Sequence, residues 1–152
     1  MIYSCLLFLL YSLPQVSHAP PTAAEVAKEV YVQTNRYRKS VGLNALRVQK
    51  ELNAIAQKHS QAMASGRLPF SHQGFDQRVE EVKAYAKKDW RVAENLYATY
   101  NTNNIGGHAL KDWIASPGHK ENLDGRFIFT GIGVARSKSG EYFITQLYVG
   151  RR

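Results

Sequence analysis

The chain has 152 residues, which is long enough for one domain with a sizeable core and too short for two. Its formal net charge is +8, and this excess favours an anionic partner, such as an envelope polymer, an acidic glycan or lipid headgroups. The basic residues are scattered in small groups and no nucleic-acid-binding motif is present, so we expect no nucleic acid partner.

The N-terminal segment resembles a secretory leader. Its apolar run from Cys5 to Leu10 is shorter than the roughly 20 residues of a membrane span, and Ser17-His18-Ala19 fits a cleavage site. We therefore expect a signal peptide over residues 1–19, one mature domain over residues 20–152, no transmembrane span, and a secreted, extracellular or cell-envelope location. A wrongly assigned start or an uncleaved anchor is the alternative, because no basic residue precedes the run. Cys5 is the only cysteine, so the mature domain would contain no disulfide.

Two amphipathic helices are predicted next. Thr22 and Glu25 form a capping box that starts a helix running to about Lys39. The second helix ends at Gly66, and its apolar stripe follows the i, i+3, i+4, i+7 spacing: Leu52, Ile55, Ala56, His59, Ala62 and Met63. His59 lies on this stripe, where a histidine is more often a hydrogen-bonded packing residue than a ligand.

The second half of the chain mixes loops, short helices and strands. A loop with Phe70-Ser71-His72 precedes a short helix over residues 76–85, and residues 90–97 read as an extended segment. Another amphipathic helix carries Trp113 and is expected to break at Pro117-Gly118, with Gly118 at positive φ and His119 just after the break. Two final strands, 127–135 and 142–149, form a hairpin. Gly131 and Gly133 mark a close approach or a bulge.

Helices that precede an antiparallel hairpin, with an extended segment between them, predict an α+β fold in which helices sandwich a central antiparallel sheet. Such an arrangement could bring together the segments around His72, Glu94 and His119. Two imidazoles, one carboxylate and water form a known ligand set for Zn²⁺. Hydrogen bonds from these side chains to loop backbone are an equally open interpretation. No G-x-S-x-G elbow supports a serine hydrolase.

Several motifs appear together in a characteristic order. They are Asn35-x-x-Arg38, His59-Ser60-x-x-Met63, Phe70-Ser71-His72, Ala93-Glu94-Asn95, Trp113-x-x-Ser116-Pro117-Gly118-His119-x-x-Asn122 and the strand residues 130–135. This combination resembles the CAP superfamily, the SCP domains of cysteine-rich secretory, antigen 5 and pathogenesis-related 1 proteins, and most of all its short cysteine-free bacterial branch. The resemblance implies a three-layer α-β-α sandwich whose central cleft contains two histidines and two acids. Members have been associated with sterol or lipid binding, immune signalling and proteolysis.

The resemblance assigns His72, Glu94 and His119 to this cleft, with Asn95 and Ser116 beside them. Ser116 stands where better-known members carry the second acid, so the predicted metal ligands are His72, Glu94 and His119. The favoured hypothesis is a non-catalytic module that binds an unknown ligand, such as a lipid or an anionic envelope polymer, with or without Zn²⁺. The alternative is a zinc-dependent hydrolase that uses the same cleft. Glu94 could not easily be both ligand and base, and this favours binding.

Overall fold

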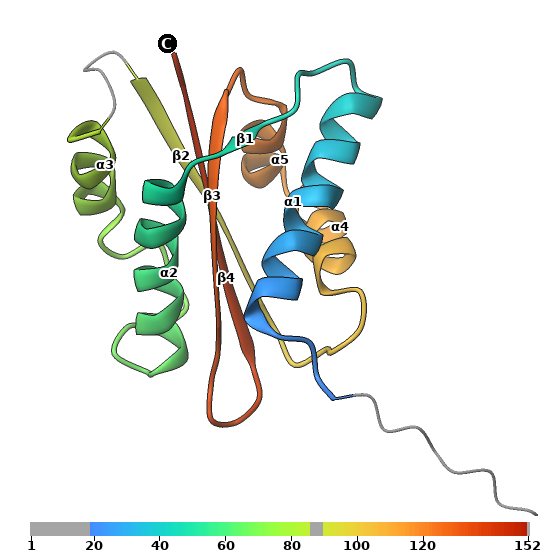
Figure 1. The fold of residues 1–152 in the computed structure, drawn as a ribbon, viewed down its shortest axis with the longest axis vertical. Helices are drawn as coiled ribbons and strands as arrows, with labels where there is room; N and C mark the ends of the chain where they lie inside the picture. The colour runs from blue at the N-terminus through green and yellow to red at the C-terminus, as the bar shows by residue number, and fades with distance from the viewer. Residues whose placement is uncertain (1–18, 86–89, 152) are drawn as a thin grey trace, which may run out of the picture.

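The computed structural model describes residues 19–85 and 90–151 (Figure 1). The predicted leader before Ala19, with Cys5, lies outside the described residues. In the described part of the chain, no helix is both long and apolar enough to cross a membrane.

Five helices and four strands make up the described fold. In chain order they are α1 (Ala23–Ser40), β1 (Arg47–Val48), α2 (Lys50–Ala64), α3 (Phe75–Lys83), β2 (Trp90–Thr99), α4 (Ile105–Ala115), α5 (Pro117–Asp124), β3 (Phe129–Arg136) and β4 (Tyr142–Arg151). The strand order is β1-β3-β4-β2. The three long strands are antiparallel, as predicted, whereas β1 pairs with β3 in parallel and makes the sheet mixed.

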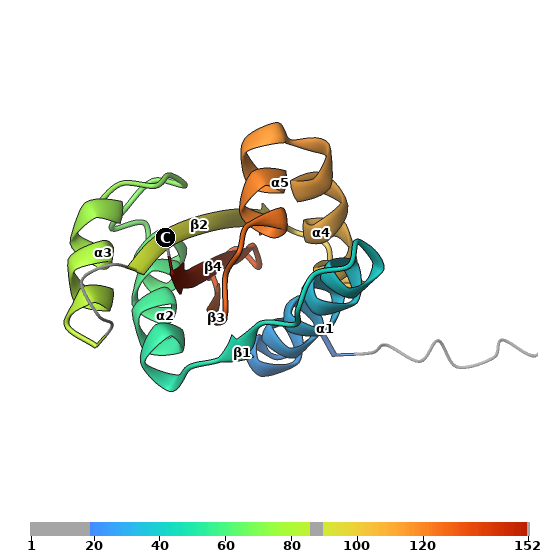
Figure 2. The same ribbon diagram turned by 90° about the horizontal axis from the view of Figure 1, so that it is seen from above.

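The helices form two layers around this sheet. One layer contains α2 and α3, and the other contains α1, α4 and α5 (Figures 1 and 2). The two main clusters of buried side chains lie on opposite faces of the sheet. One contains side chains of α2 and α3, and the other contains Val30, Ile105 and Trp113. The indole of Trp113 is 1% exposed and donates a hydrogen bond of 2.8 Å to Leu96 O. The predicted α-β-α sandwich is confirmed.

The helix α1 begins where the sequence predicts. The Thr22 hydroxyl accepts from Glu25 N, and the Glu25 carboxylate accepts from Thr22 N at 2.7 Å, which completes the capping box. Its buried face consists of Val26, Val30, Thr34 and Arg38, spaced one turn apart. Arg38 occupies a position in this buried stripe where an aliphatic residue would be usual. The helix α1 therefore brings one guanidinium into the interior.

Gly131 and Gly133 explain how closely α2 packs on β3. A Cβ atom at either position would overlap the backbone of α2, at Leu52 and Asn53 or at Ala56 and Gln57. The predicted close approach is therefore present. It lets the amide oxygens of Asn53 and Gln57 accept hydrogen bonds of 2.8 and 3.0 Å from the backbone N–H groups of Ile132 and Val134. The Gln57 amide also donates to Val134 O at 2.9 Å.

Candidate functional site

His72, Ser116 and His119 line one cleft at the outer side of β2. His72 lies in the loop between α2 and α3, and His119 lies at the start of α5, so the two come from different helical layers (Figure 2). The centroids of the two imidazole rings are 6.4 Å apart. The cleft has a volume of about 450 Å³, and its other lining residues are Phe70, Ser71, Leu96, Tyr97, Ala98, Asp112 and Trp113.

A break between α4 and α5 places His119 in this cleft. Ser116 has an extended backbone, with φ −100° and ψ 117°, and Pro117 is the first residue of α5. Proline suits this position because its fixed φ is helical and its missing N–H needs no partner there. The predicted break is therefore confirmed, but the predicted positive φ at Gly118 is wrong. Gly118 lies within α5 and is not among the residues with positive φ.

Asn95 and Asn122 fix α5 against β2. The amide of Asn95, which is completely buried, donates to His119 O at 3.1 Å. Asn122 donates to the side-chain oxygen of Asn95 at 2.9 Å and to Glu94 O at 3.2 Å. Asn95 was predicted to line the cleft, and the structure places it behind the cleft, where it holds the backbone of His119.

The carboxylate of Glu94 lies behind His72 and is 1% exposed. One oxygen, Oε1, is 2.8 Å from His72 Nδ1 and 2.7 Å from Arg78 Nη2, while Oε2 is 2.6 Å from Arg78 Nε. Because a carboxylate accepts hydrogen bonds, we assign the His72 proton to Nδ1. Nε2 of His72 has no hydrogen-bond partner among the described residues, and the side chain is 52% exposed.

Arg78 also determines which ring nitrogen of His59 carries the proton. Nη1 of Arg78 is 3.2 Å from His59 Nδ1, and since arginine only donates, Nδ1 must accept. Nε2 of His59 therefore carries the proton, which it donates to Ser71 O at 3.0 Å. Burial and, second, the charge of Arg78 lower the pKa of His59. His59 is a neutral packing residue, as the helical stripe indicates, and it holds the loop that carries His72.

This arrangement predicts a loss of stability in mild acid. The folded protein resists protonation of His59, whereas the unfolded chain binds the proton near the ordinary histidine pKa of about 6.5. Above that pH, the free energy of unfolding should therefore keep its full value. It should fall as the pH drops from about 6.5 toward the lower pKa of His59 in the folded protein. His59→Gln keeps a donor and an acceptor but does not titrate, so it should reduce the fall. Urea unfolding at several pH values measures this.

The exposed His108 on α4 offers the matched control, because His108→Gln replaces a histidine that the fold does not bury. The pH dependence of that variant should equal the wild type's. If His59→Gln and wild type lost stability equally between pH 7.5 and 5.5, the assignment of His59 as a neutral, buried group would be wrong.

The cleft environment disfavours protonation of His119. Burial is the larger cause that lowers the pKa of His119, and the nearby His72 adds to it. Two further groups of the cleft come from β2 and α4. Burial raises the pKa of the Tyr97 phenol, and Asp112 acts in the same direction. The cleft therefore offers two imidazoles, a phenol, a serine hydroxyl and one carboxyl group.

The three predicted metal ligands differ in whether their ligand atoms already have hydrogen-bond partners. Both oxygens of Glu94 are engaged by Arg78 and His72, whereas His72 Nε2 is free. Within residues 19–85 and 90–151, no group of three or more His, Cys, Asp or Glu side chains is arranged to hold a metal ion. A carboxylate that orients a histidine through its second nitrogen is common beside metal sites. The donor set thus fits two histidine ligands, with Glu94 as the residue that orients one of them.

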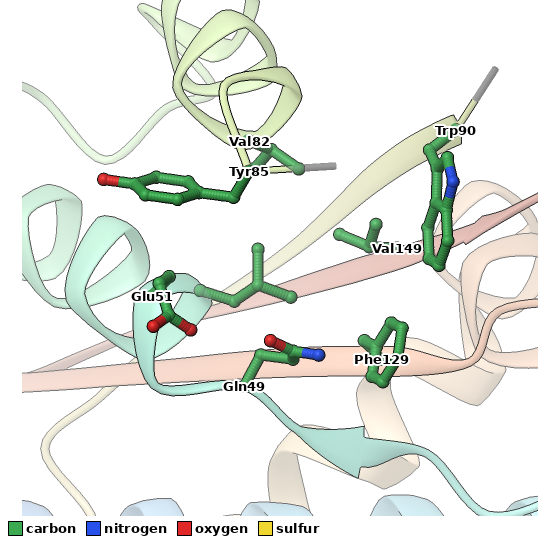
Figure 3. Close-up of a pocket in the computed structure, with 8 residues that line it drawn as sticks. Gln49, Glu51, Val82, Tyr85, Trp90, Phe129 and Val149 are labelled. Atoms are coloured by element: carbon green, nitrogen blue, oxygen red, sulfur yellow. The ribbon is translucent and has the colours of Figure 1, made fainter. Parts of the chain in front are cut away.

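A second hollow, of about 310 Å³, lies in the α2 and α3 layer and has no residue in common with the histidine cleft (Figure 3). The rings of Trp90 and Phe129 stack there, with centroids 5.5 Å apart and planes inclined by 14°. Val82 and Val149 complete an apolar wall, and Glu51 lies at the rim. This hollow offers a hydrophobic surface, and its lining contains no histidine.

Comparison with known proteins decides the family. The model of the cysteine-rich secretory protein family, CAP, matches residues 32–148. The chain belongs to the CAP family. The chain is 28% identical over 135 residues to the uncharacterized protein YkwD of Bacillus subtilis (strain 168), a match that covers 88% of this chain. The chain spans 50% of the length of that relative.

Solved structures of CAP domains share the fold. An outer surface protein of Borrelia burgdorferi superimposes with a TM-score of 0.69 and 19% identity, covering 88% of this chain and 98% of that one. An extracellular protein of Bacillus anthracis that contains an SCP domain also gives a TM-score of 0.69, with 23% identity, covering 89% of this chain and 45% of that one. These similarities show the three-layer architecture of the CAP domain.

Sequence reasoning missed two residues of this CAP domain. Arg78 is buried and lies one helical turn from buried Val82, so an arginine at the i−4 position of a core valine was the available signal. Asp112 precedes Trp113 on α4 and lines the cleft beside it. No pattern in the sequence distinguished it from a solvated helix residue.

Proposed function

We propose that this CAP domain is a non-catalytic ligand-binding module that uses the cleft between His72 and His119. The observation that carries the proposal is the pair of imidazoles, brought from two helical layers to face one cleft of about 450 Å³. A cleft of this size suits a small ligand, and its polar groups converge from several directions. His72, His119 and Ser116 are the residues that we expect to contact the ligand.

The state of Glu94 supports binding over hydrolysis. A general base must reach the proton that it removes, and Glu94 is buried with both oxygens engaged. Asp112 is the acid that lines the cleft. A zinc-dependent hydrolase, the alternative function, would therefore need Asp112 as its base, and Asp112→Asn should abolish hydrolysis of ester or peptide substrates. Absence of such hydrolysis in wild type contradicts the alternative.

We propose a secreted or envelope location for the protein. One structural relative is described as an extracellular protein and another as an outer surface protein. The apolar N-terminal segment with Ser17-His18-Ala19 points in the same direction. A ligand in that setting could be a lipid or an anionic envelope polymer, which the net charge of +8 would attract.

A divalent cation such as Zn²⁺ is part of this proposal. His72 Nε2 and the His119 ring would hold it, with Glu94 orienting His72. The cation would supply an electrophilic contact for an anionic ligand group. An imidazole must be neutral to bind the cation, and the lowered pKa of His119 favours the neutral form of that ring.

Zinc should raise the melting temperature at pH 7.5 and lose most of this effect by pH 5.5, because protons compete for the imidazoles. By mass action, the gain is about 2.7 kcal/mol when free zinc exceeds its dissociation constant a hundredfold. The His72→Ala/His119→Ala variant should show no shift, and Ser116→Glu, which adds a carboxylate to the cleft, should tighten binding. Differential scanning fluorimetry with zinc, checked by titration calorimetry, measures both effects.

His108→Ala serves as the control, since it removes an exposed histidine of α4 that lies outside the cleft. Its zinc response should match the wild type's. An equal response in wild type and the double variant would reject the metal site and would leave hydrogen bonds as the means of recognition.

A further inference from the structure

A basic pocket lies at the end of the domain where the chain ends, marked C in Figure 1. It has a volume of about 590 Å³ and shares no residue with the histidine cleft. Its walls come from the turn after α1, the start of β2, the segment between α5 and β3, and the end of β4. The lining residues are Arg38, Gly42, Leu43, Asn44, Arg91, Arg126, Phe127, Ile128 and Arg151, so four arginines and no described acidic residue line it.

Arg38 contributes a buried charge to this pocket. It is 1% exposed and donates to four backbone carbonyls, at Asn44, Leu123, Gly125 and Phe127. In the described part of the chain, no carboxylate lies within ion-pair distance of it. Because arginine keeps its proton in proteins, its charge is compensated by these four carbonyl dipoles and, beyond ion-pair distance, by the carboxylate of Asp124. A buried guanidinium without a carboxylate partner favours an anion nearby.

Arg91 is positioned by an aromatic ring. Its guanidinium carbon is 5.0 Å from the centroid of Phe127, which packs in the core. Its only carboxylate partner in the described residues is Glu121, at 3.4 Å, whose side chain is 75% exposed. Such an exposed pair is weak and screened by salt, so an incoming anion can replace it. Arg126 and Arg151 are exposed, and no ion pair to a described carboxylate involves either.

We propose that this arginine pocket binds a phosphate or phosphodiester group. Guanidinium groups present forked donors that match the oxygens of phosphate, and three of them converge here from separate strands and loops. The volume exceeds what one phosphate ion needs, so the ligand would be a larger phosphorylated molecule or one repeat of a phosphate-containing polymer.

A further hollow of about 340 Å³ extends this pocket along β2. It shares Arg91 with the arginine pocket and His72 with the histidine cleft. Because neighbouring hollows share these side chains, the proposal extends to a track of three hollows that leads from the arginines to the histidines. A ligand with several phosphates in a row could occupy more of this track than a single phosphate, and it should bind more tightly.

The test uses inorganic phosphate, tripolyphosphate, and vesicles of phosphatidylglycerol or of phosphatidylcholine alone as probes. Calorimetry should show that tripolyphosphate binds the wild type more tightly than phosphate does. The Arg91→Gln/Arg126→Gln/Arg151→Gln variant should bind tripolyphosphate at least tenfold more weakly. Arg38 is left intact, because its four carbonyl contacts make a folding defect the expected result of replacing it.

The control variant is Arg36→Gln/Lys111→Gln/Lys138→Gln, which removes three exposed positive charges outside the pocket. Its binding should change by less than twofold. Equal weakening in the two variants would show attraction by net charge and would overturn the proposal, as would absence of binding to every probe. Binding to phosphatidylglycerol vesicles that the pocket variant alone loses would identify a lipid headgroup as the source of the phosphate. The three substituted arginines do not line the histidine cleft, so the zinc response of the pocket variant should equal the wild type's, which separates this test from that of the metal site.

Discussion

Replacing Arg78 by methionine should destabilise the protein by about 3–5 kcal/mol, measured by urea unfolding at pH 7. The guanidinium makes two short contacts with the buried carboxylate of Glu94, and a third contact holds His59. Methionine can fill much of the volume, but it leaves the charge of Glu94 buried without a cation. Removing one partner of a buried pair is costly because the other cannot regain its hydration.

Two further variants isolate this cause. Glu94→Gln in the Arg78→Met background removes the orphaned charge and should recover part of the loss. Lys83→Met breaks an exposed pair with Glu80 on the same helix and should change stability by less than about 0.5 kcal/mol. A loss below about 1 kcal/mol for Arg78→Met would mean that water reaches Glu94 through the hollow beside it.

Replacing Gly133 by alanine should cost about 3 kcal/mol or more. The added methyl group would overlap the backbone of Ala56 and Gln57, so α2 would have to move away from β3. Overpacking usually costs about 1–3 kcal/mol, and here the displacement also lengthens the hydrogen bonds between Gln57 and Val134. Thermal or urea unfolding gives the change in stability.

Gly118→Ala is the matched control for that substitution. Gly118 lies in α5, and a Cβ atom there has no neighbour within 4 Å. Alanine has a higher helix propensity, so this variant should be as stable as the wild type or gain up to about 1 kcal/mol. If Gly133→Ala were equally harmless, α2 would not pack on β3 as closely as described.

The sequence predicted the long elements because each has a strong local signal. The stripe of α2, the capping box of α1 and the β-branched hairpin of β3 and β4 fall where expected. The strand β1 was not predicted, since its two exposed residues carry no periodicity. Gly118 was expected at positive φ because a Pro-Gly pair commonly ends a helix and forms a turn. Here Pro117 begins a new helix and Gly118 continues it.

The candidate site was predictable to a smaller extent. The motifs indicated that His72 and His119 would meet, and their rings face the same cleft. The partner of Glu94 could not be read from the sequence, because Arg78 reaches it only when α3 packs against β2. The role of Asn95 also depends on tertiary contacts, since its amide acts on the backbone of His119 rather than in the cleft. Whether metal binds there stays a prediction.

The amide contacts of α2 determine which partners the sheet can recruit. Beyond β1, the outward N–H groups of β3 at Ile132 and Val134 are taken by Asn53 and Gln57. On the opposite margin, Asn122 and the indole of Trp113 occupy the outward carbonyls of β2 at Glu94 and Leu96. At these positions neither edge can accept an added strand from a peptide or from a second copy of the chain. Recognition at these edges must therefore go through side chains and pockets, and the domain is protected there against edge-to-edge aggregation.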